Sequence, residues 1–403
     1  MLVHNLFATL VSMNLESIKD VDVGPSFKKE ILNQVQMNIN TTLCNANKNI
    51  FVFSGADHDD FYNITLELYK NKDSIILPCL SARPNGPTLF TTPGEGWSNN
   101  NMFRTIHMLI ELFGLTKNIN FTDCSLNSKQ MYERFCLTEN IDPRLNCFFF
   151  KNNFNSPNLK LNNTLQYLHF DYNELPLNDK KLYGCFNIRP RIHRQGLVAL
   201  LHYYDLLEDG HVSSPGDWRA EKNGYDKDTD WKKFIYGAEE QLHKLKFYND
   251  LKEKIVELNR IYPLRIDNRV DFKNVDAACQ SRTLYNCRMD SLIEVIPETL
   301  FDGPHFFSEK TFAPISLGKP FIMTNSANSL ESLKLLGYKT FHPFIDETYD
   351  SIVDGGKRLN YIVRELKRLQ QLRLSDPTEF YKIYNSMLEI SKYNKEEFSK
   401  NIT

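Results

Sequence analysis

The sequence predicts an α/β fold with two Rossmann-like domains, followed by C-terminal helices that pack back on the first domain. At 403 residues the chain is longer than one ordinary hydrophobic core requires. Along its length, short apolar runs alternate with segments of helical periodicity, which is typical of a parallel sheet covered by helices. The expected boundaries are residues 1–176 for the first domain, 177–350 for the second and 351–403 for the C-terminal helices.

The first domain alternates strand and helix signals. Residues 49–55 form a short apolar run that ends in glycine, as expected of a buried strand. Residues 61–70 are expected to form a helix, and residues 102–115 carry apolar side chains at a helical spacing. The Gly- and Pro-rich stretch 83–97 is expected to be a long loop. Further strands are expected at 74–78, 147–150 and 165–168.

The second domain is expected to follow a polar linker at residues 171–181 and to begin with a strand at 182–188. A helix at 197–207 and a polar loop at 213–230 come next. A long amphipathic helix is then expected at 234–258. The remaining elements are strands at 291–295 and 320–323 and the terminal helices at 357–372 and 377–400.

The composition restricts the class of protein. Apolar residues make up 41% and charged residues 24% of the chain, which is typical of globular proteins. The net charge of −2 provides no global attraction for nucleic acid. No apolar run approaches the roughly 20 residues that span a bilayer, and no secretory signal is apparent. The eight cysteines contain no Cys-x-x-Cys pair, which argues against structural zinc or a disulfide framework. A cytoplasmic protein without a transmembrane segment is expected.

The most informative block is residues 306–323. Two aromatic residues lead into Ser308, Glu309 and Lys310, and an amphipathic turn and a buried strand follow. Ser308 is expected to cap a helix, with Glu309 in its first turn, where the helix dipole favours a carboxylate. Such a Glu can accept a hydrogen bond from a ribose hydroxyl while the neighbouring Lys meets a phosphate. The alternative is an ordinary capped helix start.

A second block places Arg189, Arg191, His193 and Arg194 directly after a predicted strand. Ligands of open α/β sheets bind at the carboxyl ends of strands, and guanidinium groups bind phosphate in a bidentate manner. This block therefore predicts a phosphate site. The alternative is a solvated basic helix start.

Both blocks resemble GT-B glycosyltransferases of the fucosyltransferase-like and phage-type families. The first is similar to a Thr-Glu-Lys segment, with Ser308 in place of the Thr. The second is similar to an Asn-Arg-Arg-Pro-Arg-x-His-Arg run, with Ile188 in place of an Arg. Residues 292–299, an apolar strand ending in Glu298, and residues 329–344, a helix followed by Gly337 and a strand, extend the resemblance over about 180–350.

The resemblance implies a GT-B architecture and the transfer of a hexosyl or pentosyl group from a nucleotide-sugar. It implies no metal and no other cofactor, because basic groups stabilise the leaving diphosphate. Glu298 is expected to help hold the donor or its sugar, although an ordinary loop Glu is an equally simple interpretation. The donor-binding residues would be Arg189, Arg191, Arg194, Glu298, Ser308, Glu309 and Lys310.

Asp57, Asp59 and Asp60 follow the first strand and are the candidate catalytic residues. Three interpretations remain open. A carboxylate could act as general base on the acceptor hydroxyl. An Asp-x-Asp pair could instead bind magnesium or manganese, as in GT-A enzymes. Asp59 and Asp60 could also be the N-cap and first-turn residues of the helix that follows.

For the acceptor, the resemblance to phage-type enzymes implies a hydroxymethylated base in duplex DNA, which the basic residues between 357 and 373 would contact through phosphates. The alternative acceptor is a surface glycan or lipopolysaccharide. A different class of function is a non-catalytic nucleotide- or glycan-binding protein that keeps the fold.

Overall fold

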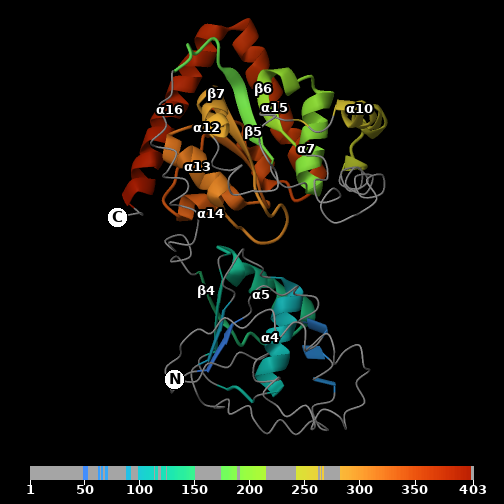
Figure 1. The fold of residues 1–403 in the computed structure, drawn as a ribbon. Coiled ribbons are helices and arrows are strands. Elements are labelled where there is room, and N and C mark those ends of the chain that lie inside the picture. Colours follow the sequence, from blue (N-terminus) through green and yellow to red (C-terminus); the bar gives the residue numbers. More distant parts are fainter. Residues whose placement is uncertain are drawn as a thin grey trace. The chain divides into compact units, whose positions relative to one another are not determined.

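The computed structural model describes residues 49–52, parts of 62–70, 88–91, most of 99–149, 174–187, 191–214, 242–261, 264, 266 and 282–400. These residues belong to two compact units (Figure 1). The first unit consists of the described residues up to Asn153 together with Gly303–Phe306. The second unit consists of all the others.

The first unit contains a four-stranded parallel sheet whose strands are neighbours in chain order. Two helices, α4 (Asn100–Leu112) and α5 (Ser128–Glu139), follow the second and third strands and carry the chain back for the next parallel strand. The strands are β1 (Asn49–Val52), β2 (Thr88–Thr91), β3 (Ile119–Asp123) and β4 (Asn146–Phe149).

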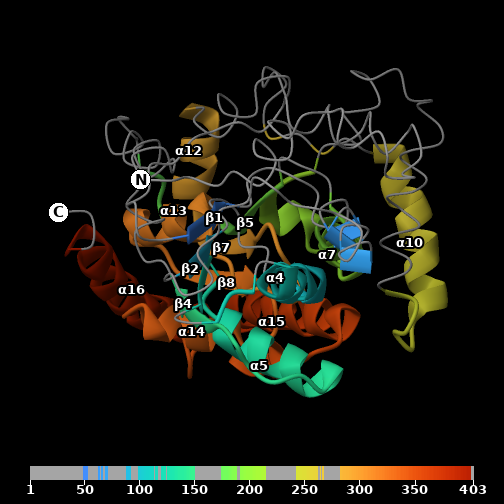
Figure 2. The same ribbon diagram turned by 90° about the horizontal axis from the view of Figure 1, so that it is seen from below.

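An aromatic core joins α4 and α5 to this sheet. The ring centroid of Phe103 on α4 lies 5.2 Å from that of Tyr132 and 5.4 Å from that of Phe135, both on α5. Figure 2 shows the two helices next to each other. Phe90 and Phe121 bring the sheet into the same buried cluster. Burying one such side chain stabilises a fold by about 1.5–3 kcal/mol, so apolar packing can hold this unit together.

The side chain of Asn127 holds the short segment Gly303–Phe306 in the first unit. Its Oδ1 accepts from the backbone N–H of His305 at 2.8 Å, and its Nδ2 donates to the carbonyl of Gly303 at 3.2 Å. The backbone N–H of Leu126 donates to the carbonyl of His305 at 3.2 Å. These bonds explain why four residues far along the sequence belong to this unit.

The second unit also has a four-stranded parallel sheet, but its strand order is β6-β5-β7-β8. From β5 the chain moves to one side to form β6, and it later returns to the other side to form β7 and β8. The order therefore reverses between β5 and β7. The strands are β5 (Lys181–Phe186), β6 (Gly210–Ser213), β7 (Ser291–Pro297) and β8 (Phe321–Thr324).

Helices cover both faces of the second sheet. The β5–β6 and β7–β8 crossovers run in opposite directions, so the right-handed rule places α7 and α13 on opposite faces. Helix α15 packs on α7 and α16 packs on α13 (Figure 1). The helices are α7 (Ile192–Tyr203), α10 (Tyr248–Ile261), α12 (Arg282–Met289), α13 (Glu309–Leu317), α14 (Ser329–Leu335), α15 (Gly355–Ser375) and α16 (Pro377–Lys400), with 3-10 turns η3 (Leu207–Asp209) and η4 (Glu347–Ser351).

The predicted α/β class with parallel sheets is confirmed, but the expected place of the C-terminal helices is wrong. Helices α15 and α16 belong to the second unit, not the first. One reason is the long apolar stripe of α15, in which Leu359, Ile362, Val363 and Leu366 are fully buried in the second unit. Gly196 of α7 allows close packing there, since a Cβ at this position would lie 3.2 Å from Leu359.

Three local predictions also need correction. The expected loop at 83–97 contains β2, whose Phe90 is completely buried. The long helix expected at 234–258 is interrupted in the described region, because residues 243–247 form turns before α10 begins at Tyr248, and Leu242 and Leu245 are buried there. No strand follows Gly337, since the backbone N–H groups of residues 341 and 342 donate to the Glu347 carboxylate instead of a neighbouring strand.

Among the helices of the described residues, none has the length and apolar character needed to cross a membrane.

Candidate functional site

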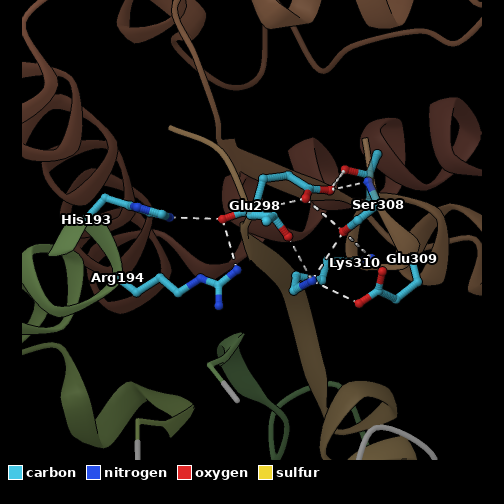
Figure 3. Close-up of polar contacts among 8 residues, drawn as sticks. His193, Arg194, Glu298, Ser308, Glu309 and Lys310 are labelled. Carbon is cyan, nitrogen blue, oxygen red and sulfur yellow. Dashed lines mark hydrogen bonds and ion pairs between the residues drawn. The ribbon is translucent and has the colours of Figure 1, made fainter. Parts of the chain in front are cut away.

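The candidate site lies at the carboxyl ends of β5 and β7, where the strand order of the second sheet reverses. In open parallel sheets, ligands bind in the crevice at such a reversal, because the two flanking loops diverge to opposite faces. Here the loop after β5 leads to the start of α7, and the loop after β7 leads to the start of α13. Both predicted blocks are therefore brought to one place (Figure 3).

The carboxylate of Glu298, directly after β7, is completely buried and accepts four hydrogen bonds. Its Oε1 accepts from the backbone N–H of Ser308 at 2.8 Å and from the Thr311 hydroxyl at 2.6 Å. Its Oε2 accepts from the backbone N–H of Thr299 at 2.9 Å and from the Ser308 hydroxyl at 2.8 Å. Glu298 was expected to face the donor, but its carboxylate instead holds the start of α13 to the end of β7.

The backbone carbonyl of Glu298 faces α7 (Figure 3). It accepts from Nε2 of His193 at 2.9 Å and from Nη2 of Arg194 at 3.0 Å. Burial, followed by repulsion from Arg194, lowers the pKa of His193 well below its usual value, so the imidazole is neutral at pH 7. Because a carbonyl can only accept, Nε2 carries the proton of the neutral ring.

The cations of the α7 start remain charged although they are close together. Burial, followed by repulsion from Arg191, lowers the pKa of Arg194 to about 10, while attraction by Glu298 and Glu309 acts in the opposite direction. At pH 7 both guanidinium groups are therefore positive. An anionic ligand would relieve this repulsion, which gives the cluster a physical preference for phosphate.

Lys310 lies on the other side of the site, in the first turn of α13. Its Nζ donates to Glu309 Oε1 at 2.9 Å and makes longer contacts of 3.3 Å to the Ser308 hydroxyl and 3.4 Å to the Thr299 hydroxyl. The Lys310 and Glu309 side chains remain 18% and 35% exposed, so both reach solvent. The predicted cap is confirmed, since Ser308 Oγ accepts from the backbone N–H of Lys310.

The two helix starts differ in how their N-termini are satisfied. At α13 the Glu298 carboxylate and the Ser308 cap already accept from the backbone, so the protein itself supplies the anion that this end favours. At α7 the N-cap residue is Arg191, whose side chain makes no capping hydrogen bond. The arrangement therefore favours an anion at the start of α7, and Lys310 contacts the loop after β7 from α13.

Several predicted residues lie outside the described residues. They are Arg189 of the basic block and the three candidate catalytic carboxylates, Asp57, Asp59 and Asp60. Within the part of the chain that the structure describes, no group of three or more His, Cys, Asp or Glu side chains is placed to hold a metal ion.

Three contributors were missed in the sequence. Thr299 and Thr311 donate to the Glu298 carboxylate, and Phe301 stacks on His193 with a centroid distance of 4.9 Å and an interplanar angle of 8°. Thr311 lies three residues after the cap Ser308, so it faces the same side of the first helical turn. That spacing was the available signal for Thr311. Nothing in the sequence indicates the role of Phe301.

The basic residues of α15 differ from their expected role as contacts for DNA. Arg368 donates to Glu365 and to the carbonyl of Phe344, and Arg373 donates to the carbonyls of residues 178 and 180. Arg358 is 1% exposed. Three of the six predicted basic residues thus make internal contacts, although Arg368 is still exposed like Lys357 and Arg364, and Lys367 is partly exposed.

Comparison with known proteins identifies no relative, since no family model, no curated protein and no solved structure matches the chain.

Proposed function

We propose that the protein is a glycosyltransferase of GT-B type that binds a nucleotide-sugar at the carboxyl ends of β5 and β7. The second unit would hold the donor, and the first unit would contribute the carboxylate that acts on the acceptor. The reaction would transfer a hexosyl or pentosyl group to a hydroxyl.

The observation that carries the proposal is the convergence of both predicted blocks at the reversal of strand order. Arg191 and Arg194 come from the start of α7, and Lys310 comes from the start of α13. Both groups contact the same short segment, Glu298–Thr299. Arg194 and Lys310 at this loop, with Arg191 close enough to repel Arg194, match the charge of a diphosphate, and the partly exposed Glu309 suits a ribose hydroxyl.

The proposed chemistry follows from these charges. The acceptor oxygen attacks the anomeric carbon, and the bond from that carbon to the diphosphate oxygen breaks. The acceptor proton passes to a carboxylate, for which Asp57, Asp59 and Asp60 are the candidates. The negative charge that develops on the diphosphate is stabilised by Arg191, Arg194 and Lys310, the task that a metal performs in GT-A enzymes.

The acceptor side of the proposal is less specific. Duplex DNA would need several phosphate contacts, and three of the six basic residues once assigned to them make internal bonds. This favours a glycan over DNA. Salt titration of duplex binding tests the choice, because each neutralised phosphate contributes a log–log slope of about −0.9.

The donor site is tested by replacing Lys310 with Met and measuring nucleoside diphosphate affinity by calorimetry. Losing one charge-assisted phosphate contact should cost roughly 1.5–3 kcal/mol, or about tenfold or more in affinity. Lys334→Met is the matched control, since Lys334 also pairs with a nearby Glu but lies on α14. The panel would contain ADP, CDP, GDP and UDP.

Failure of the wild-type protein to bind every member of the panel would refute the proposal. Equal affinity in the Lys310 and Lys334 variants would remove Lys310 from the site. Binding without hydrolysis or transfer of any nucleotide-sugar would favour the non-catalytic alternative.

A further inference from the structure

Arg358, in the first turns of α15, is the largest fully buried side chain of the described residues. Its Nη1 donates to the carbonyls of Ile352 at 2.6 Å and Val353 at 3.1 Å. Its Nη2 donates to the carbonyl of Phe301 at 2.6 Å and to Asp302 Oδ1 at 3.1 Å. One guanidinium group therefore fastens the chain before α15 to the loop after β7.

The same guanidinium also lies over the ring of Phe301, 4.1 Å from its centroid. A desolvated cation over an aromatic ring is attracted to it, so Phe301 is fixed by both its ring and its carbonyl. The ring in turn stacks on His193, which donates to the Glu298 carbonyl. Three contacts thus lead from Arg358 through Phe301 and His193 to Glu298, the residue that organises the candidate site.

The last residue of this series, Glu298, is held from both sides. Glu298 receives its carbonyl partners from α7 and its carboxylate partners from Thr299 and α13. If the loop after β7 shifts, His193 loses its stacking partner and the Glu298 peptide loses its fixed orientation. Both helix starts then lose their common anchor.

We propose that Arg358 is a positioning residue for the donor site. It does not touch the ligand, but it fixes the loop Glu298–Asp302 so that the cations of α7 and α13 face one diphosphate. This inference rests on the proposed function for its ligand, although its structural part concerns the loop alone. It makes donor affinity depend on a residue that was predicted to bind DNA.

A control residue on the same helix can distinguish a positioning role of Arg358 from a purely structural role. Arg373 also donates to backbone carbonyls, at 2.9 Å to those of Asn178 and Lys180, but these lie before β5 and away from the site. Arg358→Met and Arg373→Met each remove one guanidinium anchor. Only the first should affect the loop after β7.

The experiment measures two quantities in the full chain. Calorimetry with each of ADP, CDP, GDP and UDP that binds the wild type should show an increase in Kd of about tenfold or more for Arg358→Met and a change of less than about twofold for Arg373→Met. Hydrogen exchange of the ligand-free protein should accelerate over residues 298–311 in the first variant only. Arg358→Lys, which keeps the charge and one carbonyl contact, should lie between Arg358→Met and wild type.

Phe301→Leu keeps the chain testable if Arg358→Met does not fold. It removes the ring contacts to Arg358 and His193 and retains the carbonyl acceptor, so a smaller increase in both Kd and exchange is expected. Unchanged exchange over 298–311 in the folded variants would overturn the positioning role. Faster exchange in a protein whose wild type binds none of ADP, CDP, GDP and UDP would support the positioning of the loop and refute the proposed function instead.

Discussion

The two units differ in what they bury. Among the described residues, the core of the first unit is apolar and rich in aromatic rings, and its buried polar side chains are uncharged or His. Every buried Lys, Arg and Glu of the described residues lies in the second unit. They are Lys180, Arg194, Arg288, Glu294, Glu298, Lys319, Arg358 and Glu365.

Buried charge opposes folding unless it is paired and hydrogen-bonded. In the second unit, charged side chains are desolvated at the loop after β7. There Glu298, Arg194 and Arg358 fix the backbone between two helices. The first sheet has its described strands in chain order and so has no order reversal there. The difference indicates that fixed geometry is needed in the second unit, where we place the donor.

The largest expected effect tests whether the chemistry belongs to the first unit. Asn replacements at Asp57, Asp59 and Asp60 should include at least one that lowers donor hydrolysis about 10²–10⁴-fold, the usual contribution of a general base. Nucleoside diphosphate affinity should not change, because the donor would be bound by the second unit. Steady-state hydrolysis and calorimetry on the same samples separate the two quantities.

Chelation provides the complementary test for these three carboxylates. Turnover that survives EDTA agrees with a general base and with diphosphate stabilisation by cations. Loss of turnover with EDTA and its return with manganese would instead support the Asp-x-Asp metal site. That result would contradict a metal-free reaction with a general base in the first unit and diphosphate-binding cations in the second.

The next effect tests whether Glu298 organises the second unit. Glu298→Ala leaves two buried hydroxyls and two backbone N–H groups without their acceptor, so it should destabilise the unit by about 3 kcal/mol or more. Glu309→Ala, on the same helix, removes a half-exposed partner and should cost about 0.5 kcal/mol or less. Urea unfolding followed by circular dichroism measures both. Equal losses would show that the Glu298 carboxylate is not the anchor.

The smallest effect tests whether all buried charges of the second unit serve the site. Lys319 donates to the carbonyl of Ser291, at the opposite end of β7 from Glu298, and lies near the buried ion pair of Arg288 and Glu294. Burial lowers the pKa of Lys319 to about 7, against the attraction of Glu294. This cluster is built from β7 and the segments that precede β7 and β8.

Because the folded pKa of Lys319 is lower than that of the unfolded chain, the unfolded state binds more protons above pH 7. Wild-type stability should therefore rise relative to Lys319→Met between about pH 7.5 and 9, by about 1 kcal/mol per pH unit. The exposed Lys334→Met should parallel the wild type. Nucleotide affinity should remain unchanged in both, and a loss in Lys319→Met would connect this cluster to the site.

Local signals in the sequence predicted much of the second unit. Ser308 and Glu309 mark the start of α13 through a capping pattern that needs only neighbouring residues. The limits of α16, residues 377–400, agree with the prediction, since Pro377 occupies a first-turn position and a long helical periodicity follows. These features depend on the chain within about one turn.

What could not be predicted depends on residues far apart in the chain. Arg358 looks like part of a basic helix surface, but its partners Phe301 and Asp302 lie more than fifty positions away. Glu298 looks like a ligand contact, yet it caps a helix that starts eleven residues later. In the first unit, β2 was missed because its flanking Gly and Pro residues outweigh four strand-forming ones.

The segment Gly303–Phe306 has a consequence for evolution. It belongs to the first unit, while the residues on either side of it belong to the second. A recombination event that exchanged everything before residue 154 would leave these four residues without Asn127, whose amide recognises the carbonyl of Gly303 and the N–H of His305. The new neighbour would have to match that backbone. Descendants of such a shuffling event should therefore have inherited both pieces together or have redesigned this loop.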